Sequence, residues 1–196
     1  MIKVLLTSIA NFDREIQQAV AVHPEAYLFR GLPGAGPALM PRLVAAFGTQ
    51  RERFDSANQL QSYCGIAPVT KASGNSCSIH FRRACPKFLR QTFHEFASHS
   101  IAKSHWARAF YDHQRAQRNG HQKGQRTGHH AAVRALAFKW IRILFRCWKE
   151  GKPYDEAVYL RSLQQHHSPL QKLLPSATQL QWQTKAGFQK ISLKNT

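Results

Sequence analysis

A serine-bearing turn holds the residues of this sequence that are best suited to covalent chemistry. Ser73 and Ser76 lie in a stretch of small residues that predicts an exposed bend. A serine hydroxyl can attack a phosphodiester when nearby cations stabilise its alkoxide and the charge that develops on phosphorus. Lys71 precedes the bend, and Arg82 and Arg83 follow it. The bend is therefore a candidate nucleophile site, although the same residues also make an ordinary polar turn.

A glycine-rich hairpin is a second candidate site, for phosphate contact. The sequence Leu-Pro-Gly-Ala-Gly-Pro at 32–37 separates two helical segments, in the form of a helix-hairpin-helix. Gly34 and Gly36 would let the backbone turn sharply and present its N–H groups. These donors would lie at the N-terminus of a helix over 38–47, whose partial positive charge attracts an anion. The same glycines also suit a tightly packed turn between helices, and both interpretations stay open.

The net charge favours a polyanionic partner. The 196 residues include 28 Lys and Arg against 10 Asp and Glu, which gives a formal charge of +18. Such a surface is tolerated most easily beside nucleic acid, and we expect DNA. Charges on a helix are usually only a solvated face, but here few acids separate them. The expected basic clusters are Arg82, Arg83, Lys87 and Arg90; Arg115, Arg118, Lys123 and Arg126; and the helical stripe Lys139, Arg142, Arg146 and Lys149.

Several other classes of protein are excluded by composition and spacing. No apolar run approaches the roughly 18 residues of a membrane span, and no secretory leader is recognisable. The four cysteines form no CxxC pair, which predicts reduced thiols in a cytoplasmic protein. The ten acids are scattered and the histidines match no ligand motif, so we assign no metal site to this chain.

The elements that must position these residues are mostly helical. We expect a mainly α fold, in which a helix-hairpin-helix and a small helical bundle carry a short extended segment over 66–81 with the serine turn. The last strong helix should bury one face, formed by Val133, Leu136, Ala137, Trp140, Ile141, Leu144 and Trp148. The expected helices cover 4–22, 38–47, 57–63, 86–100, 104–117 and 131–150. The expected domains are a helical connector over 1–24, a main domain over 25–160 and a loosely ordered basic tail over 161–196.

The order of several short motifs resembles one family. It is similar to the C-terminal transposase domain of the IS110/IS116 insertion-sequence family, which is related to the Piv and MooV DNA invertases. The resemblance covers roughly residues 25–160. It rests on the motifs at 32–37, 54–57, 63–68, 72–74, 88–90, 110–111, 120–123, 135–139 and 151–155.

This resemblance implies DNA recombination by a serine nucleophile. In such proteins a RuvC-like domain with a four-carboxylate Mg²⁺ site precedes a domain whose serine forms a covalent phosphoserine link to DNA and frees a 3′ hydroxyl. At least part of the family is guided by a bridge RNA. The matching position here is Ser73, with Ser76 as the second choice. Gly34 and Gly36 would present donors to phosphate, and Lys71, Arg82, Arg83, Lys87, Arg90, Arg142 and Arg146 would position the DNA.

The match also departs from the family. Met1 lies inside the part that resembles the helical connector, so we expect the carboxylate domain to be missing from this chain. We therefore expect Mg²⁺ only in that other domain, and a chain that is inactive alone. The sequence leaves three possibilities open. The chain can work with a separate carboxylate-domain partner, it can assemble with further copies of itself into a dimer or tetramer, or it can be a truncated remnant. The alternative function is a non-catalytic DNA- or RNA-binding module.

Overall fold

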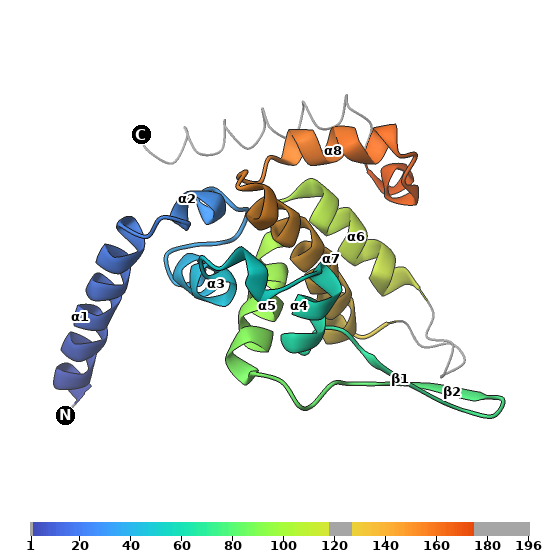
Figure 1. The fold of residues 1–196 in the computed structure, drawn as a ribbon, viewed down its shortest axis with the longest axis horizontal. Coiled ribbons are helices and arrows are strands. Elements are labelled where there is room, and N and C mark those ends of the chain that lie inside the picture. Colours follow the sequence, from blue (N-terminus) through green and yellow to red (C-terminus); the bar gives the residue numbers. More distant parts are fainter. Residues whose placement is uncertain (1, 118–126, 175–196) are drawn as a thin grey trace, which may run out of the picture. The chain divides into compact units, whose positions relative to one another are not determined.

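The computed structural model of this chain describes residues 2–117 and 127–174 (Figure 1). The chain divides into two compact units, residues 1–156 and residues 157–196. Three members of the second basic cluster, Arg118, Lys123 and Arg126, lie outside the described residues, as does the predicted tail beyond residue 174. The predicted domain boundaries at 24/25 and 160/161 remain predictions.

The fold is mainly helical with one small antiparallel hairpin, which confirms the predicted fold class. The described part of the second unit consists of α8 (Glu156–Gln165) and the short 3₁₀ helix η2 (Pro169–Leu173). The first unit contains α1 (Ile2–Ala21), α2 (Ala26–Phe29), α3 (Leu39–Phe47), the 3₁₀ helix η1 (Arg51–Arg53), α4 (Ala57–Tyr63), β1 (Val69–Ser73), β2 (Ser76–His80), α5 (Lys87–Ser100), α6 (His105–Ala116) and α7 (His129–Glu150).

Helix α7 is the centre of the first unit, where α4, α5 and α6 pack against it (Figure 1). All seven side chains of its predicted core face are buried, so that prediction is confirmed. The ring of Trp140 packs on Trp106 of α6 with 4.6 Å between centroids and on Phe96 of α5 with 5.0 Å. The Trp140 indole N–H donates to Ser100 Oγ at 2.8 Å. One aromatic cluster therefore holds three helices together, and it forms the rigid body from which the hairpin projects.

Local signals in the sequence set several of the helix ends. Ser56 is the N-cap of α4 and accepts a hydrogen bond from Gln59 N, and Ser104 caps α6 in the same way. Gly151 ends α7 in the left-handed conformation that glycine tolerates best. Pro41 falls in the first turn of α3 because that helix begins at Leu39, so its missing N–H removes no helical hydrogen bond.

Helix α1 buries none of its side chains in the described structure. Leu5, Ile9, Phe12 and Ile16, which recur at intervals of three and four residues, are between 44% and 65% exposed. Gln17 anchors the helix by donating to the carbonyl of Pro37 at 2.8 Å. The apolar stripe of α1 therefore faces solvent.

The second unit is more ordered at its start than the composition indicates. Residues 161–165 continue α8, and residues 169–173 form η2, where the sequence predicts a loose tail. Leu163 and Leu170 are buried, and burial of apolar side chains stabilises this segment although its average composition is polar. Among the described helices, none is long and apolar enough to cross a membrane.

Candidate nucleic-acid interface

The predicted serine turn is the tip of the β1–β2 hairpin, which extends away from the helices (Figure 1). Ser73 ends β1 and pairs with Ser76, the first residue of β2. Two residues join them, and the first, Gly74, has φ 54°. Glycine at that position suits a type II′ turn, whose twist matches the two strands. Ser73 and Ser76 are both exposed, so their hydroxyls are accessible to a bound strand.

One face of the hairpin carries four polar side chains. Residues opposite each other in an antiparallel pair share a face, as do alternate residues along a strand. The register pairs Ser73 with Ser76 and Lys71 with Ser78, so these four residues lie on the same face. Ser78 Oγ lies 2.9 Å from His80 Nε2. Lys71 is about 7 Å along the strand from Ser73, within reach of a phosphate that contacts Ser73.

Arg82 and Arg83 lie at the other end of the hairpin. They follow His80, which pairs with Val69 at the base of the ladder. Four residues at about 3.3 Å each place this base roughly 13 Å from Ser76. The structure therefore brings Lys71 near the serines and leaves Arg82 and Arg83 more than one phosphate away. A strand lying along the hairpin would contact both groups at different phosphates.

The segment after β2 is held by Arg90 of α5. Its guanidinium donates to the carbonyl of Arg82 at 3.4 Å and lies 4.7 Å from the ring centre of Phe81. Arg134 of α7 lies 4.9 Å from the same ring centre. Gly65, with φ 70°, faces this segment, and a Cβ added there would collide with the Cys85 side chain. Arg90 thus orders the base of the hairpin, in addition to its predicted contact with DNA.

The remaining predicted DNA-contacting cations differ in their exposure and in whether they already form an ion pair. Lys87 and Arg142 are exposed, whereas Arg146 forms a 2.7 Å ion pair with Glu150. That hydrogen bond raises the pKa of Arg146. In the stripe on α7, Lys139 is half-buried and Lys149 donates to the carbonyl of Arg51. Burial, and then the charge of Arg142, lower the pKa of Lys139.

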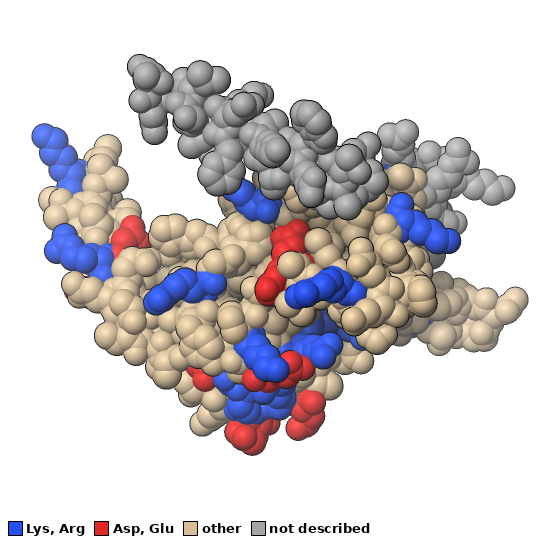
Figure 2. Space-filling model, turned by 90° about the horizontal axis from the view of Figure 1, so that it is seen from above, with Lys and Arg blue, Asp and Glu red and all other residues tan. Residues whose placement is uncertain are grey.

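The hairpin and the segments next to it in the chain contain no acids. No Asp or Glu occurs between Asp55 and Glu95. In the parts of the chain that the structure covers, none of Arg82, Arg83 and Lys87 forms an ion pair. On the face shown in Figure 2, by contrast, Asp and Glu side chains lie next to several of the Lys and Arg side chains. The positive charges of Arg82, Arg83 and Lys87, next to the hairpin in the chain, are therefore not neutralised by acids in the described structure.

The predicted helix-hairpin-helix has α2 and α3 as its helices. Gly34 has φ 86°, and a Cβ added there would lie 2.7 to 2.9 Å from backbone atoms of His99 and Ser100. Gly36 is exposed with nothing within 4 Å of an added Cβ, and its carbonyl accepts from Leu39 N at 3.1 Å. Close packing is therefore sufficient to explain glycine at 34. Gly36 is the position open to solvent, and phosphate contact by either residue stays a prediction.

The sequence patterns do not single out Arg134 as a site residue. It lies on α7 away from the basic stripe, and it reaches Phe81 beside the small residues Ala131 and Ala135. A helical wheel of α7 gives one signal that Arg134 contacts another element. Arg134 lies beside the core face and next to Ala131 and Ala135, whose small side chains leave space for a neighbouring segment. That this element is β2 depends on tertiary contacts.

An exposed hydroxyl hairpin in an acid-free segment of a helical, strongly basic chain has the features of proteins that bind a nucleic-acid backbone. Residues 26–112 match the model of the transposase IS116/IS110/IS902 family. The resemblance predicted from the sequence is thereby confirmed.

Relatives agree with this assignment. This chain is 29% identical to a mini-circle putative transposase for IS117 from Streptomyces coelicolor. The match extends over 146 residues, which are 74% of this chain and 33% of the relative. It is 28% identical over 144 residues, 73% of this chain and 33% of the relative, to an uncharacterized protein of insertion element IS110 from the same organism. A pilin gene-inverting protein of Moraxella bovis is 39% identical over 77 residues, 37% of this chain and 23% of the relative. The chain spans a third or less of these relatives.

Proposed function

We propose that this chain is the DNA-binding, serine-bearing part of a bacterial DNA-rearranging enzyme that acts in insertion-sequence transposition. The observation that carries the proposal is Ser73, exposed at the tip of an acid-free hairpin within a segment that matches a transposase family. The chain would work in the cytoplasm, where bacterial DNA lies.

Ser73 would act as the nucleophile towards a phosphodiester. Its Oγ would form a bond to phosphorus, the bond from phosphorus to the 3′ oxygen would break, and the proton of the serine would end on that oxygen. Lys71, on the same face, would stabilise the charge on the phosphate oxygens. An isolated two-stranded ladder is only marginally stable, so the hairpin can adjust to a bound strand.

Activation of this serine has to come from outside the described residues. Among residues 2–117 and 127–174, no side chain hydrogen-bonds to the hydroxyl of Ser73 or Ser76, and no three His, Cys, Asp or Glu residues cluster as a metal site. The donor set described here thus does not fit the Mg²⁺ that the resemblance implies. A carboxylate domain, in the same polypeptide or a partner, would hold that ion.

The cations would position the DNA. Arg82, Arg83 and Lys87 would hold phosphates near the hairpin base, while Arg142 and Arg146 would contact the backbone from α7. Exchange between two duplexes requires more than one nucleophile, which favours a dimer or tetramer. The solvent-facing apolar stripe of α1 is a surface that such an assembly can bury. Bridge RNA remains an expectation from the resemblance.

Peptide mapping of a covalent adduct tests the proposal. The chain would be mixed with the carboxylate domain of a full-length relative, Mg²⁺ and DNA that contains the element ends. Trypsin cleaves after Lys71 and Arg82, so residues 72–82 form one peptide that contains Ser73, Ser76 and Ser78. We expect mass spectrometry to find a nucleotide remnant on this peptide, and fragmentation to place it on Ser73. A remnant on any other peptide would contradict the assignment.

A non-catalytic nucleic-acid-binding module is the second candidate. It is favoured by the absence of a base beside Ser73 in the described structure and by the packing role of Gly34. Duplex binding without an adduct in any combination of the components would support this function.

Arg142→Ala is expected to weaken DNA binding by about three- to ten-fold at 0.15 M salt. The loss of one phosphate contact should also reduce the slope of log affinity against log salt concentration by about one. Fluorescence anisotropy with a labelled duplex measures both quantities. Arg14→Ala on α1 is the matched control, because it removes an exposed cation outside the predicted interface. Equal effects of the two substitutions would show that Arg142 acts only through net charge.

A further inference from the structure

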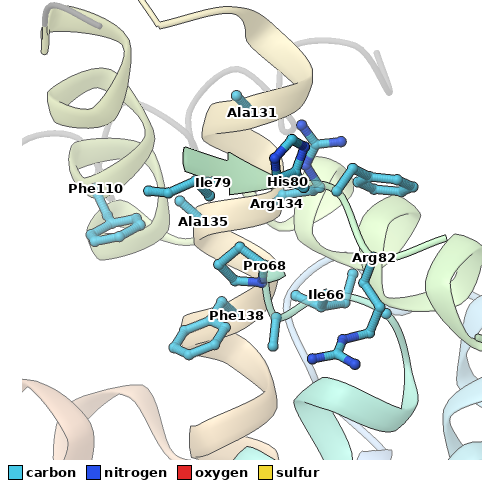
Figure 3. Close-up of a pocket in the computed structure, with 13 residues that line it drawn as sticks. Ile66, Pro68, Ile79, His80, Arg82, Phe110, Ala131, Arg134, Ala135 and Phe138 are labelled. Atoms are coloured by element: carbon cyan, nitrogen blue, oxygen red, sulfur yellow. The ribbon is translucent and has the colours of Figure 1, made fainter. Parts of the chain in front are cut away.

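A pocket of about 490 Å³ lies at the base of the hairpin (Figure 3). Its walls come from four places in the chain: the segment after α4, the end of β2 with the segment that follows it, α6, and α7. Ile66, Pro68, Phe110 and Phe138 provide apolar surface. This volume falls in the range of pockets that hold small molecules.

Hydrogen-bond donors complete the lining. Arg82 lines the pocket, and its Nε is buried without a partner among the described residues. The Arg82 side chain runs past Ile66 in Figure 3, on the side of the pocket away from Phe110. His80 and Arg134 are also in the lining, while no Asp or Glu is. The charge of the pocket is therefore complementary to an anionic ligand.

Two aromatic rings of the lining, Phe110 and Phe81, lie next to cations. Lys139 Nζ lies 5.2 Å from the ring centre of Phe110. The guanidinium groups of Arg90 and Arg134 lie 4.7 Å and 4.9 Å from the ring centre of Phe81. Flat apolar faces next to cations are the arrangement that holds unstacked bases of a nucleic-acid strand, with cations at the phosphates.

We propose that this pocket receives one unstacked nucleobase of a nucleic-acid strand that runs along the hairpin. The proposal extends the proposed function, since the same strand would reach Ser73. The base would pack against Phe110 and Phe138, and the cations of the lining would attract its phosphate. The hairpin base is roughly 13 Å from the tip, about four base-pair steps along one strand at 3.4 Å each. The unstacked base would thus anchor the strand a short distance from the bond that Ser73 attacks.

Strands with and without bases test this pocket. The full chain would be titrated with labelled 12-nucleotide oligothymidine and with an abasic 12-mer that keeps the phosphates, with anisotropy as the readout. We expect the wild type to bind oligothymidine about ten-fold more tightly. Ala135→Leu narrows the pocket from α7 and should remove that preference, while a 20-base-pair duplex should bind as before. Ala102→Leu adds the same volume at an exposed turn outside the lining and should change nothing.

The outcomes separate this inference from the proposed function. If the wild type binds oligothymidine and the abasic strand with equal affinity, the pocket does not receive a base. Duplex binding in the same experiment would leave the proposed function standing. If Ala135→Leu still prefers oligothymidine over the abasic strand, the inference about the pocket is also overturned. Failure to bind any strand or duplex overturns both. If Ala135→Leu does not fold by circular dichroism, the comparison of the two strands by the wild type decides. A matched oligouridine distinguishes an RNA source of the base from a DNA source.

Discussion

Replacing Ser73 by alanine is expected to abolish the covalent protein–DNA adduct and to leave duplex affinity within about two-fold of the wild type. Removing the attacking oxygen leaves no route to the phosphoserine link, and loss of a nucleophile reduces such reactions by about a thousand-fold or more. The side chain is exposed and makes no hydrogen bond in the described structure, so neither the fold nor the phosphate contacts depend on it. Denaturing electrophoresis of labelled DNA measures the adduct.

Ser76→Ala and Ser78→Ala are the matched controls for this prediction. Ser76 lies opposite Ser73 on the same face of the hairpin, and Ser78 is two residues further along β2. Both controls should retain the adduct, since they keep the attacking oxygen and the turn. If Ser73→Ala forms the adduct at the wild-type level and Ser76→Ala does not, the nucleophile is Ser76. If all three variants form it, the hairpin is not the reacting element.

Gly34→Ala is expected to lower the free energy of unfolding by about 3 kcal/mol. A left-handed backbone costs a residue with a Cβ about 1 to 2 kcal/mol, and forcing extra volume into a packed site costs about 1 to 3 kcal/mol. Both apply at Gly34, whose φ is 86° and whose added Cβ would meet the backbone of His99 and Ser100. Backbone moves less readily than a side chain, so the clash has little relief. Urea unfolding followed by circular dichroism measures the change.

Gly36→Ala is the control in the same hairpin. It has nothing within 4 Å of an added Cβ and no positive φ, so its free energy of unfolding should stay within about 0.5 kcal/mol of the wild type. The two variants also test phosphate contact. A large loss of DNA affinity in folded Gly36→Ala would indicate that a phosphate approaches this backbone closely. Equal stability of the two variants would contradict the packing role of Gly34.

Local patterns predicted most of the fold. The apolar repeat of α7 predicts its buried face, because a helix repeats every 3.6 residues whatever its partner. Ser56 and Gly151 mark helix ends, because capping and left-handed geometry depend on nearby backbone. The exposed serine turn follows likewise from its small residues. Composition does not reveal α8 and η2 at the start of the predicted tail, where Leu163 and Leu170 are buried although the segment is polar on average.

The chemistry at the hairpin base depends on residues that are distant in the chain. Arg134 meets Phe81 across more than fifty residues, and the pocket joins segments from Gly65 to Phe138. Proximity in sequence also misleads here, since a strand places Arg82 far from Ser73 although only nine positions separate them. The sequence alone determined the helices, the exposed turn, the excess of positive charge and the resemblance to a transposase family. Only the tertiary structure decided which cations accompany the serines and which line the pocket, because side chains from separate elements meet only when the core has packed.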